Sequence, residues 1–242
     1  MTKIESQLAE KELSNATIAK EHSDHLIEYI TANDTKEIKE SNPRLATEFN
    51  NSLTDLVNTI QSESPTESEV KDKVSNINDI LSELVSARID KEQLDNVTVK
   101  ALVVNDLVGE SLEHYASAIG IEENGHDEKQ NKSSDSNSTG NENNVTANIV
   151  DEDDYQTAQA AASRVIERYN EIKPSEDTNS SQLADSLSSL KSKIDNRSSF
   201  DVIDKTVDEK VSPLLNEIFK LNLVEEEDHD SAETESHKIE SN

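Results

Sequence analysis

Histidines are the residues of this chain best suited to metal chemistry, because the chain contains no cysteine and neutral imidazole is the commonest metal ligand in proteins. His22 and His25 are three positions apart in a segment rich in Ala, Glu and Lys. On a helix this spacing places both side chains on one face, where the two rings could chelate a single transition-metal ion. Glu21 and Glu28 flank the pair, and Glu28 continues the same face.

A second pair of potential ligands follows in the middle of the chain. Glu110 and His114 are four positions apart and also share a helical face. Helical bundles bind transition metals by bringing such faces together, which gives a predicted metal site of His22, His25, Glu110 and His114. The alternative is that these are solvated histidines on acidic helices and bind nothing. The other three histidines lie in polar segments and offer at most a weak, exposed metal contact: His126, His229 and His237.

The elements that must position these residues are predicted to be helices. Apolar residues recur every three or four positions along most of the chain. Helix starts are indicated by Asn42-Pro43 and Ser64-Pro65, and by Asp95 or Asn96 as a cap. Asn33-Asp34 can end the first helix, and Pro213 should kink or split the last one. About seven helices are expected, near residues 2–32, 43–60, 65–85, 96–119, 155–172, 181–194 and 198–219.

The pattern predicts an all-α fold, an antiparallel bundle with two polar interruptions. Residues 2–120 form its N-terminal helical part and residues 155–223 its C-terminal part. Between them, residues 121–154 carry ten acidic residues and two lysines and are predicted to be a long disordered acidic insertion. Residues 224–242 are predicted to be an acidic disordered tail.

Composition excludes several classes of function. A net charge of −29 argues against nucleic acid as a partner, because its phosphates would be repelled. No apolar run reaches the length of about 20 residues that a membrane span needs. Phosphate-binding loops, His-Glu-x-x-His zinc motifs, calcium loops and nucleophile elbows are all missing from the sequence. We therefore predict a protein that is not an enzyme.

Part of the chain resembles a known group of helical domains. The pattern consists of Val103–Val108 with Glu110, then Tyr115–Gly120, and Tyr155–Ala158 after a gap. Asn42–Leu45, Leu53–Leu56 and the His22/His25 pair also suit it, so that the resemblance covers roughly residues 14–173. It is similar to extracytoplasmic domains of archaea and bacteria that accompany halocyanin-like copper modules, and to the N-terminal region of Ftr-type iron permeases. The acidic insertion departs from this pattern, as does the lack of a copper-binding domain.

Two locations and two functions follow as expectations. The resemblance implies the cell envelope and a link to metal, with iron or copper as the ion. Nine Asn-x-Ser/Thr sequons point the same way, although a polar composition also produces them by chance. The absence of a signal peptide after Met1 instead predicts the cytoplasm. The first functional hypothesis is a non-enzymatic, metal-linked helical binding domain. The alternative is a structural or protein-interaction bundle with acidic solubilising arms.

Overall fold

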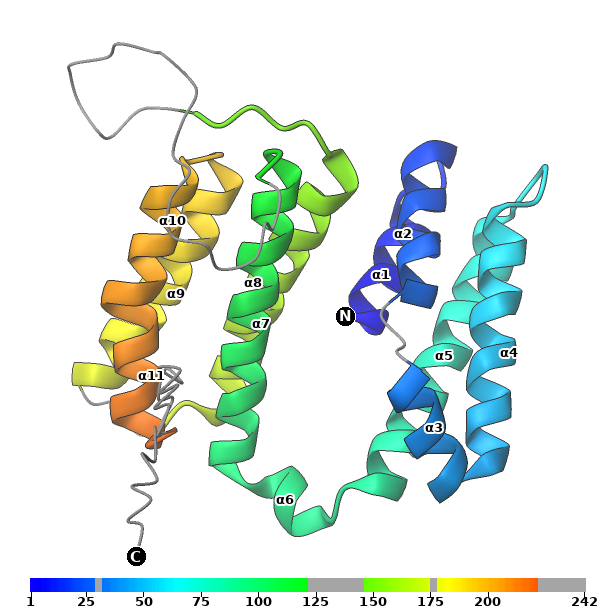
Figure 1. The fold of residues 1–242 in the computed structure, drawn as a ribbon, viewed down its shortest axis with the longest axis horizontal. Helices are drawn as coiled ribbons and strands as arrows, with labels where there is room; N and C mark the ends of the chain where they lie inside the picture. Colours follow the sequence, from blue (N-terminus) through cyan, green and yellow to red (C-terminus); the bar gives the residue numbers. More distant parts are fainter. Residues whose placement is uncertain (29–31, 122–145, 175–177, 222–242) are drawn as a thin grey trace, which may run out of the picture.

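Helices form the architecture of the computed structural model, which describes residues 1–28, 32–121, 146–174 and 178–221 (Figure 1). No strand occurs within these ranges, so the predicted all-α fold is confirmed. The helices, in chain order, are α1 (Thr2–Lys11), α2 (Ala16–Glu28), α3 (Ala32–Ser41), α4 (Pro43–Ile60), α5 (Glu67–Arg88), α6 (Lys91–Asp95), α7 (Val97–Ala118), α8 (Glu152–Ile172), α9 (Thr178–Asp195), α10 (Phe200–Thr206), the π-helical η1 (Val207–Val211) and α11 (Ser212–Phe219).

Helices α1–α5 share one hydrophobic core. Helix α4 begins as predicted, with the Asn42 side chain accepting a hydrogen bond from the Leu45 N–H and with Pro43 in the first turn. Its apolar residues, three and four positions apart, face α5 and α2. The buried members of this core include Leu26, Leu45, Phe49, Leu56, Val70 and Ile77.

Helices α7–α11 share a second core, and α6 connects the two groups at one end of the molecule (Figure 1). Asn96 caps α7 by accepting a hydrogen bond from the Thr98 N–H, as the sequence predicted. Helix α8 packs extensively on α7, and small side chains such as Ala158 and Ala162 permit a close approach. Other buried members include Tyr115, Tyr169, Leu187, Leu190 and Ile203.

The first predicted helix is in fact two helices. A single helix over residues 2–32 was expected, but α1 ends at Lys11 and α2 begins at Ala16. The chain reverses at Ser14-Asn15, residue types that favour turns. Folding back lets α1 pack along α2, so that Ala9 and Ala19 both enter the first core. The predicted stop at Asn33-Asp34 is also wrong, because α3 runs through it.

The described structure begins again at residue 146, earlier than predicted, ahead of helix α8. The insertion was expected to extend to Asp154, but residues 146–154 have defined structure. The Ala147 N–H donates to the Arg197 carbonyl, and the Asp151 side chain caps α8 by accepting from the Asp154 N–H. Acidic residues in a first helical turn are favourable next to the helix dipole, so the acidic run starts a helix. The remaining parts of the predicted insertion and tail, residues 122–145 and 222–242, lie outside the described residues.

Pro213 divides the last helix, as predicted. Helix α10 passes into η1, and α11 then begins at Ser212 with Pro213 in its first turn. Proline cannot donate the backbone hydrogen bond that a continuous α-helix requires, and the wider turn of η1 accommodates this.

None of the described helices combines the length and hydropathy needed to cross a membrane.

Candidate metal centre

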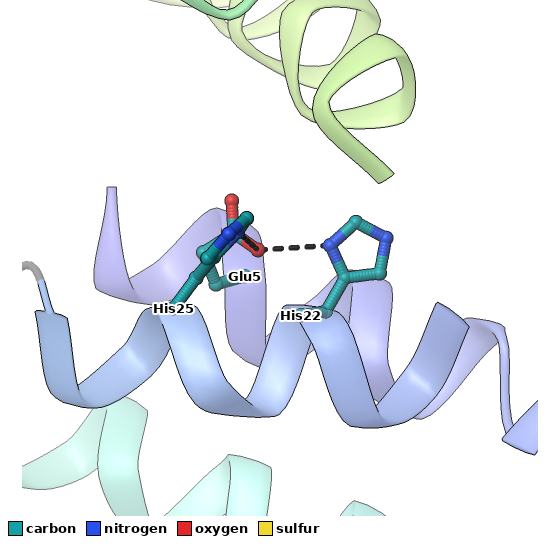
Figure 2. Close-up of side chains that lie close together, drawn as sticks. All are labelled: Glu5, His22 and His25. Atoms are coloured by element: carbon teal, nitrogen blue, oxygen red, sulfur yellow. Dashed lines mark hydrogen bonds and ion pairs between the residues drawn. The ribbon is translucent and has the colours of Figure 1, made fainter. Parts of the chain in front are cut away.

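Three potential metal ligands converge where α1 and α2 face α8. Glu5 comes from α1, and His22 and His25 come from one face of α2. One ligand atom from each of the three lies within 4.8 Å of the others. Figure 2 shows the side chains gathered together, with the Glu5 carboxylate beside both rings. Among the described residues, no other group of three or more histidines and carboxylates meets this criterion.

Glu5 and His22 form the buried part of this cluster. The His22 Nδ1 atom lies 2.9 Å from Glu5 Oε2, and both side chains are fully buried. No lysine or arginine takes part in this contact, and the carboxylate is buried against the two imidazoles and the Thr157 hydroxyl. Buried carboxylates are costly unless they are paired and hydrogen-bonded. The hydrogen bonds of this carboxylate are therefore needed to keep it inside the fold.

His25 lies between the carboxylates of two helices. Its Nδ1 atom is 3.8 Å from Glu5 Oε2 and 3.6 Å from Asp153 Oδ2. Asp153 lies in the first turn of α8 and its side chain is only 7% exposed, whereas His25 is 24% exposed. Asp153 thus lies beside His25 from the second group of helices, but it is not one of the three residues whose ligand atoms lie within 4.8 Å of one another.

Residues of α8 orient the buried ligands. The Thr157 hydroxyl donates to Glu5 Oε1 at 2.8 Å, which directs the other carboxylate oxygen, Oε2, to the histidines. The Gln156 Oε1 atom lies 3.3 Å from His22 Nε2. With Nε2 hydrogen-bonded to Gln156, the ring presents Nδ1 to the cluster. Such partners fix the ring orientation and tautomer of metal-ligating histidines.

The cluster strongly shifts the pKa values of its members. Burial by itself would raise the pKa of Glu5, but the hydrogen bonds from His22 and Thr157 and the adjacent His25 ring outweigh it and lower this pKa to about 2. The nearby carboxylate of Glu5 raises the pKa of His25 to about 9, against the opposing effect of burial. Burial, together with the hydrogen bond and negative charge of Asp151, raises the pKa of Asp153 to about 7. Glu5 and His25 therefore stabilise the charged forms of each other's side chains.

The predicted ligands from the middle of the chain lie nearby but form a separate contact. His114 on α7 has Nδ1 2.7 Å from Asp154 Oδ1 and Nε2 3.8 Å from Glu110 Oε2. These carboxylates face opposite ring nitrogens, so they do not share one ion with His114. The His114 and His25 rings are 6.5 Å apart between centroids. The structure thus brings the two predicted pairs into neighbouring positions, with His22 and His25 grouped with Glu5.

The spacing of the ligand atoms suits a small transition-metal ion. Bonds of about 2.0–2.2 Å at tetrahedral angles place neighbouring ligand atoms about 3.4 Å apart. The Glu5 Oε2 atom lies 2.9 Å from His22 Nδ1 and 3.8 Å from His25 Nδ1, and these separations bracket this value. Two imidazoles and one carboxylate are donors for Fe(II), Zn(II) or Cu(II), whereas Ca²⁺ takes six to eight oxygens.

Sequence reasoning missed Glu5 and Asp153. Glu5 is 17 positions before His22 and meets it only because α1 folds back on α2. Asp153 belongs to an acidic run that was interpreted as solvated, and only the start of α8 at Glu152 places it in the cluster. The available signal was the Asp151 cap followed by acidic residues, which is typical of a helix N-terminus.

Comparison with known proteins returned no match for the chain among protein families, curated proteins or solved structures.

Proposed function

We propose that this protein is a non-enzymatic helical domain that binds one divalent transition-metal ion. The ligands are Glu5 Oε2 and the Nδ1 atoms of His22 and His25. The observation that carries the proposal is the convergence of two histidines on one carboxylate, largely buried and oriented by Thr157 and Gln156. Ions with a preference for imidazole, namely Fe(II), Zn(II) and Cu(II), fit this donor set.

A second candidate function rests on a specific feature of the same cluster. The Glu5–His22 and Glu5–Thr157 contacts satisfy the carboxylate without any ion. A buried hydrogen-bonded pair of this kind can fix how helices pack. In that case the protein is a structural or interaction bundle, and the cluster only fixes the packing of α1 and α2 on α8.

Metal titration of the tag-free, chelator-treated protein distinguishes the metal-binding function from the structural one. Isothermal calorimetry with Zn(II), and the visible spectrum of Co(II) in the same site, should show one ion per chain. His22→Ala and His25→Ala should each lower the affinity by at least about tenfold, a loss at the low end of that seen on perturbing metal sites. The matched control is His229→Ala, which removes a histidine from the acidic tail and should bind like the wild type.

Equal binding by the wild type and His25→Ala would refute the proposed ligand set. No binding by the wild type, combined with a large loss of stability in His22→Ala, would favour the structural function instead.

A further inference from the structure

Three protein ligands leave an ion in the candidate metal centre with an incomplete coordination shell. Among the described residues, the ligand atoms close enough to share one ion come from Glu5, His22 and His25. Zn(II) in proteins is usually bound by four ligands in a tetrahedral arrangement, and a site with three protein ligands keeps its fourth position for water or another small donor. Two histidines and one carboxylate likewise leave open positions on Fe(II). The donor set therefore predicts at least one position that the cluster does not fill.

Two of the three ligands are enclosed by the fold. The Glu5 and His22 side chains have no exposed surface. The second carboxylate oxygen of Glu5 accepts a hydrogen bond from Thr157, and the second ring nitrogen of His22 lies 3.3 Å from Gln156 Oε1. A molecule approaching the ion from this side would have to displace these contacts with α8.

Solvent reaches the cluster at the third ligand, His25. Its side chain is 24% exposed, whereas the other two are buried. The ring lies between Asp153 of α8 and His114 of α7, with its Nδ1 atom 3.6 Å from Asp153 Oδ2 and its centroid 6.5 Å from that of His114. A donor that enters from solvent therefore arrives beside His25 and Asp153.

Asp153 lies at this entrance without belonging to the group of three ligands. Its distance of 3.6 Å from His25 Nδ1 is similar to the spacing of about 3.4 Å between neighbouring donors of a tetrahedral ion. Carboxylates that surround metal sites accept hydrogen bonds from the groups that coordinate the ion. Asp153 is therefore close enough to accept a hydrogen bond from a donor that binds the ion next to His25.

Further carboxylates make this entrance acidic. Asp151 caps α8, and Asp154 Oδ1 lies 2.7 Å from His114 Nδ1. In the part of the chain that the structure describes, no lysine or arginine forms an ion pair with Asp151, Asp153 or Asp154. Like charges repel, so an incoming anion meets an unfavourable potential here. A neutral donor does not meet this repulsion.

From these contacts we infer that the bound ion keeps one coordination position, beside His25 and Asp153, for an exchangeable neutral donor. This inference rests on the proposed function. Water takes the position when no other donor is present, and its O–H group donates to Asp153. Small neutral nitrogen or oxygen compounds replace the water, whereas small anions bind more weakly. The centre is thus a binding site for a small neutral ligand as well as for a metal ion.

The Co(II)-loaded protein tests this position, because the visible spectrum of Co(II) changes when a ligand is added or exchanged. Imidazole is the neutral probe and azide the anionic one, both added at about pH 8, above the pKa of about 7 of Asp153. Imidazole should change the spectrum in a saturable way, and azide should need a concentration at least about tenfold higher. The cobalt content after gel filtration checks that imidazole has joined the ion and has not removed it.

Asp153→Asn tests the role of the carboxylate at the entrance. The substitution removes the charge and keeps the shape, so the variant should still bind Co(II) through Glu5, His22 and His25. The difference in affinity between imidazole and azide should narrow to about threefold or less. Glu152→Gln, an exposed neighbour in the same helical turn, is the matched control and should keep the wild-type difference.

A Co(II) spectrum that neither probe changes would overturn the inference and leave the metal site standing, since the protein itself would then fill every position. If Asp153→Asn made that spectrum responsive, Asp153 would be identified as the fourth ligand. Azide binding as tightly as imidazole in the wild type would overturn the preference for a neutral ligand. Failure of the wild type to bind Co(II) at all would overturn the proposed function as well.

Discussion

Glu5 is the residue on which the cluster depends, because it contacts both histidines and Thr157. Its side chain is fully buried, so the charge cannot be neutralised by water when a partner is lost. Breaking a buried ion pair by removing one member typically costs several kcal/mol, since the other charge stays buried. The energetic importance of this residue should therefore exceed that of the exposed ion pairs among the described residues.

The substitution Glu5→Gln should destabilise the protein by about 3–5 kcal/mol in chelator, because the buried imidazole of His22 loses its carboxylate. Urea unfolding followed by circular dichroism measures this change. Glu63→Gln, at an exposed position between α4 and α5, is the control and should stay within about 0.5 kcal/mol of the wild type. Similar losses in the two variants would mean that the buried contact is not specifically stabilising.

His25 should make the stability of the metal-free protein depend on pH. Its pKa is raised from 6.5 to about 9, so folding favours the protonated ring. The stabilisation is complete below pH 6.5 and is lost as the pH rises through 9. Asp153 acts in the same direction at lower pH, because its raised pKa of about 7 also favours the protonated form. In chelator, thermal unfolding should therefore occur at a lower temperature at pH 9.5 than at pH 6.

His25→Gln removes the titrating ring, so its thermal unfolding should change less over the interval from pH 6.5 to 9.5. An equally steep dependence in wild type and variant would assign the effect to other groups.

Of the individual residues of the site, the sequence predicted only some. The spacing of His22 and His25 on one helix was sufficient to predict that both rings face the same way, because helical geometry is local. It did not identify Glu5 or Asp153, which reach the cluster through contacts between helices that are distant along the chain. Acidic residues are so numerous here, with 52 in the chain, that composition cannot single out two of them.

The hairpin of α1 and α2 is the element that creates the site. Ala9 and Ala19 are both essentially inaccessible to solvent, and such small side chains allow two helices to approach closely. A close approach is what places Glu5, one turn before Ala9, against the His22 face of α2. The sequence favoured a continuous helix here because the turn residues 12–15 contain neither glycine nor proline.

Ala9→Leu should therefore disturb both the packing and the metal site. A larger side chain in a closely packed core typically costs about 1–3 kcal/mol. It should also move α1 away from α2 and lower the Zn(II) affinity. The control is Ala87→Leu, at an exposed position on α5, which should leave the stability and the Zn(II) affinity unchanged. Unfolding curves and zinc titrations on the same samples provide the test, and wild-type zinc affinity in a destabilised Ala9→Leu protein would show that the site does not need this approach.

The whole molecule combines a predictable fold class with an arrangement that the sequence did not reveal. Few glycines and prolines and a regular apolar period were sufficient for the all-α prediction. The same period cannot tell which helices share a core, because most of the helices carry a similar aliphatic stripe. The separation into two cores is therefore a finding of the structure. The location at the cell envelope stays a prediction.

Two separate cores should respond separately to damage. Leu45 lies in the first core and Leu187 in the second, and neither is more than 1% exposed. Replacing either by alanine should cost about 2–5 kcal/mol through lost burial and the cavity left behind. In chelator, hydrogen exchange should accelerate in α4 and α5 for Leu45→Ala, but in α8 and α9 for Leu187→Ala.

The two substitutions thus test whether the cores unfold separately, because each removes apolar contacts from one core only. If each substitution accelerated exchange in both groups of helices, α1–α5 and α7–α11, the two cores would unfold as one cooperative unit and would not behave as separate bodies.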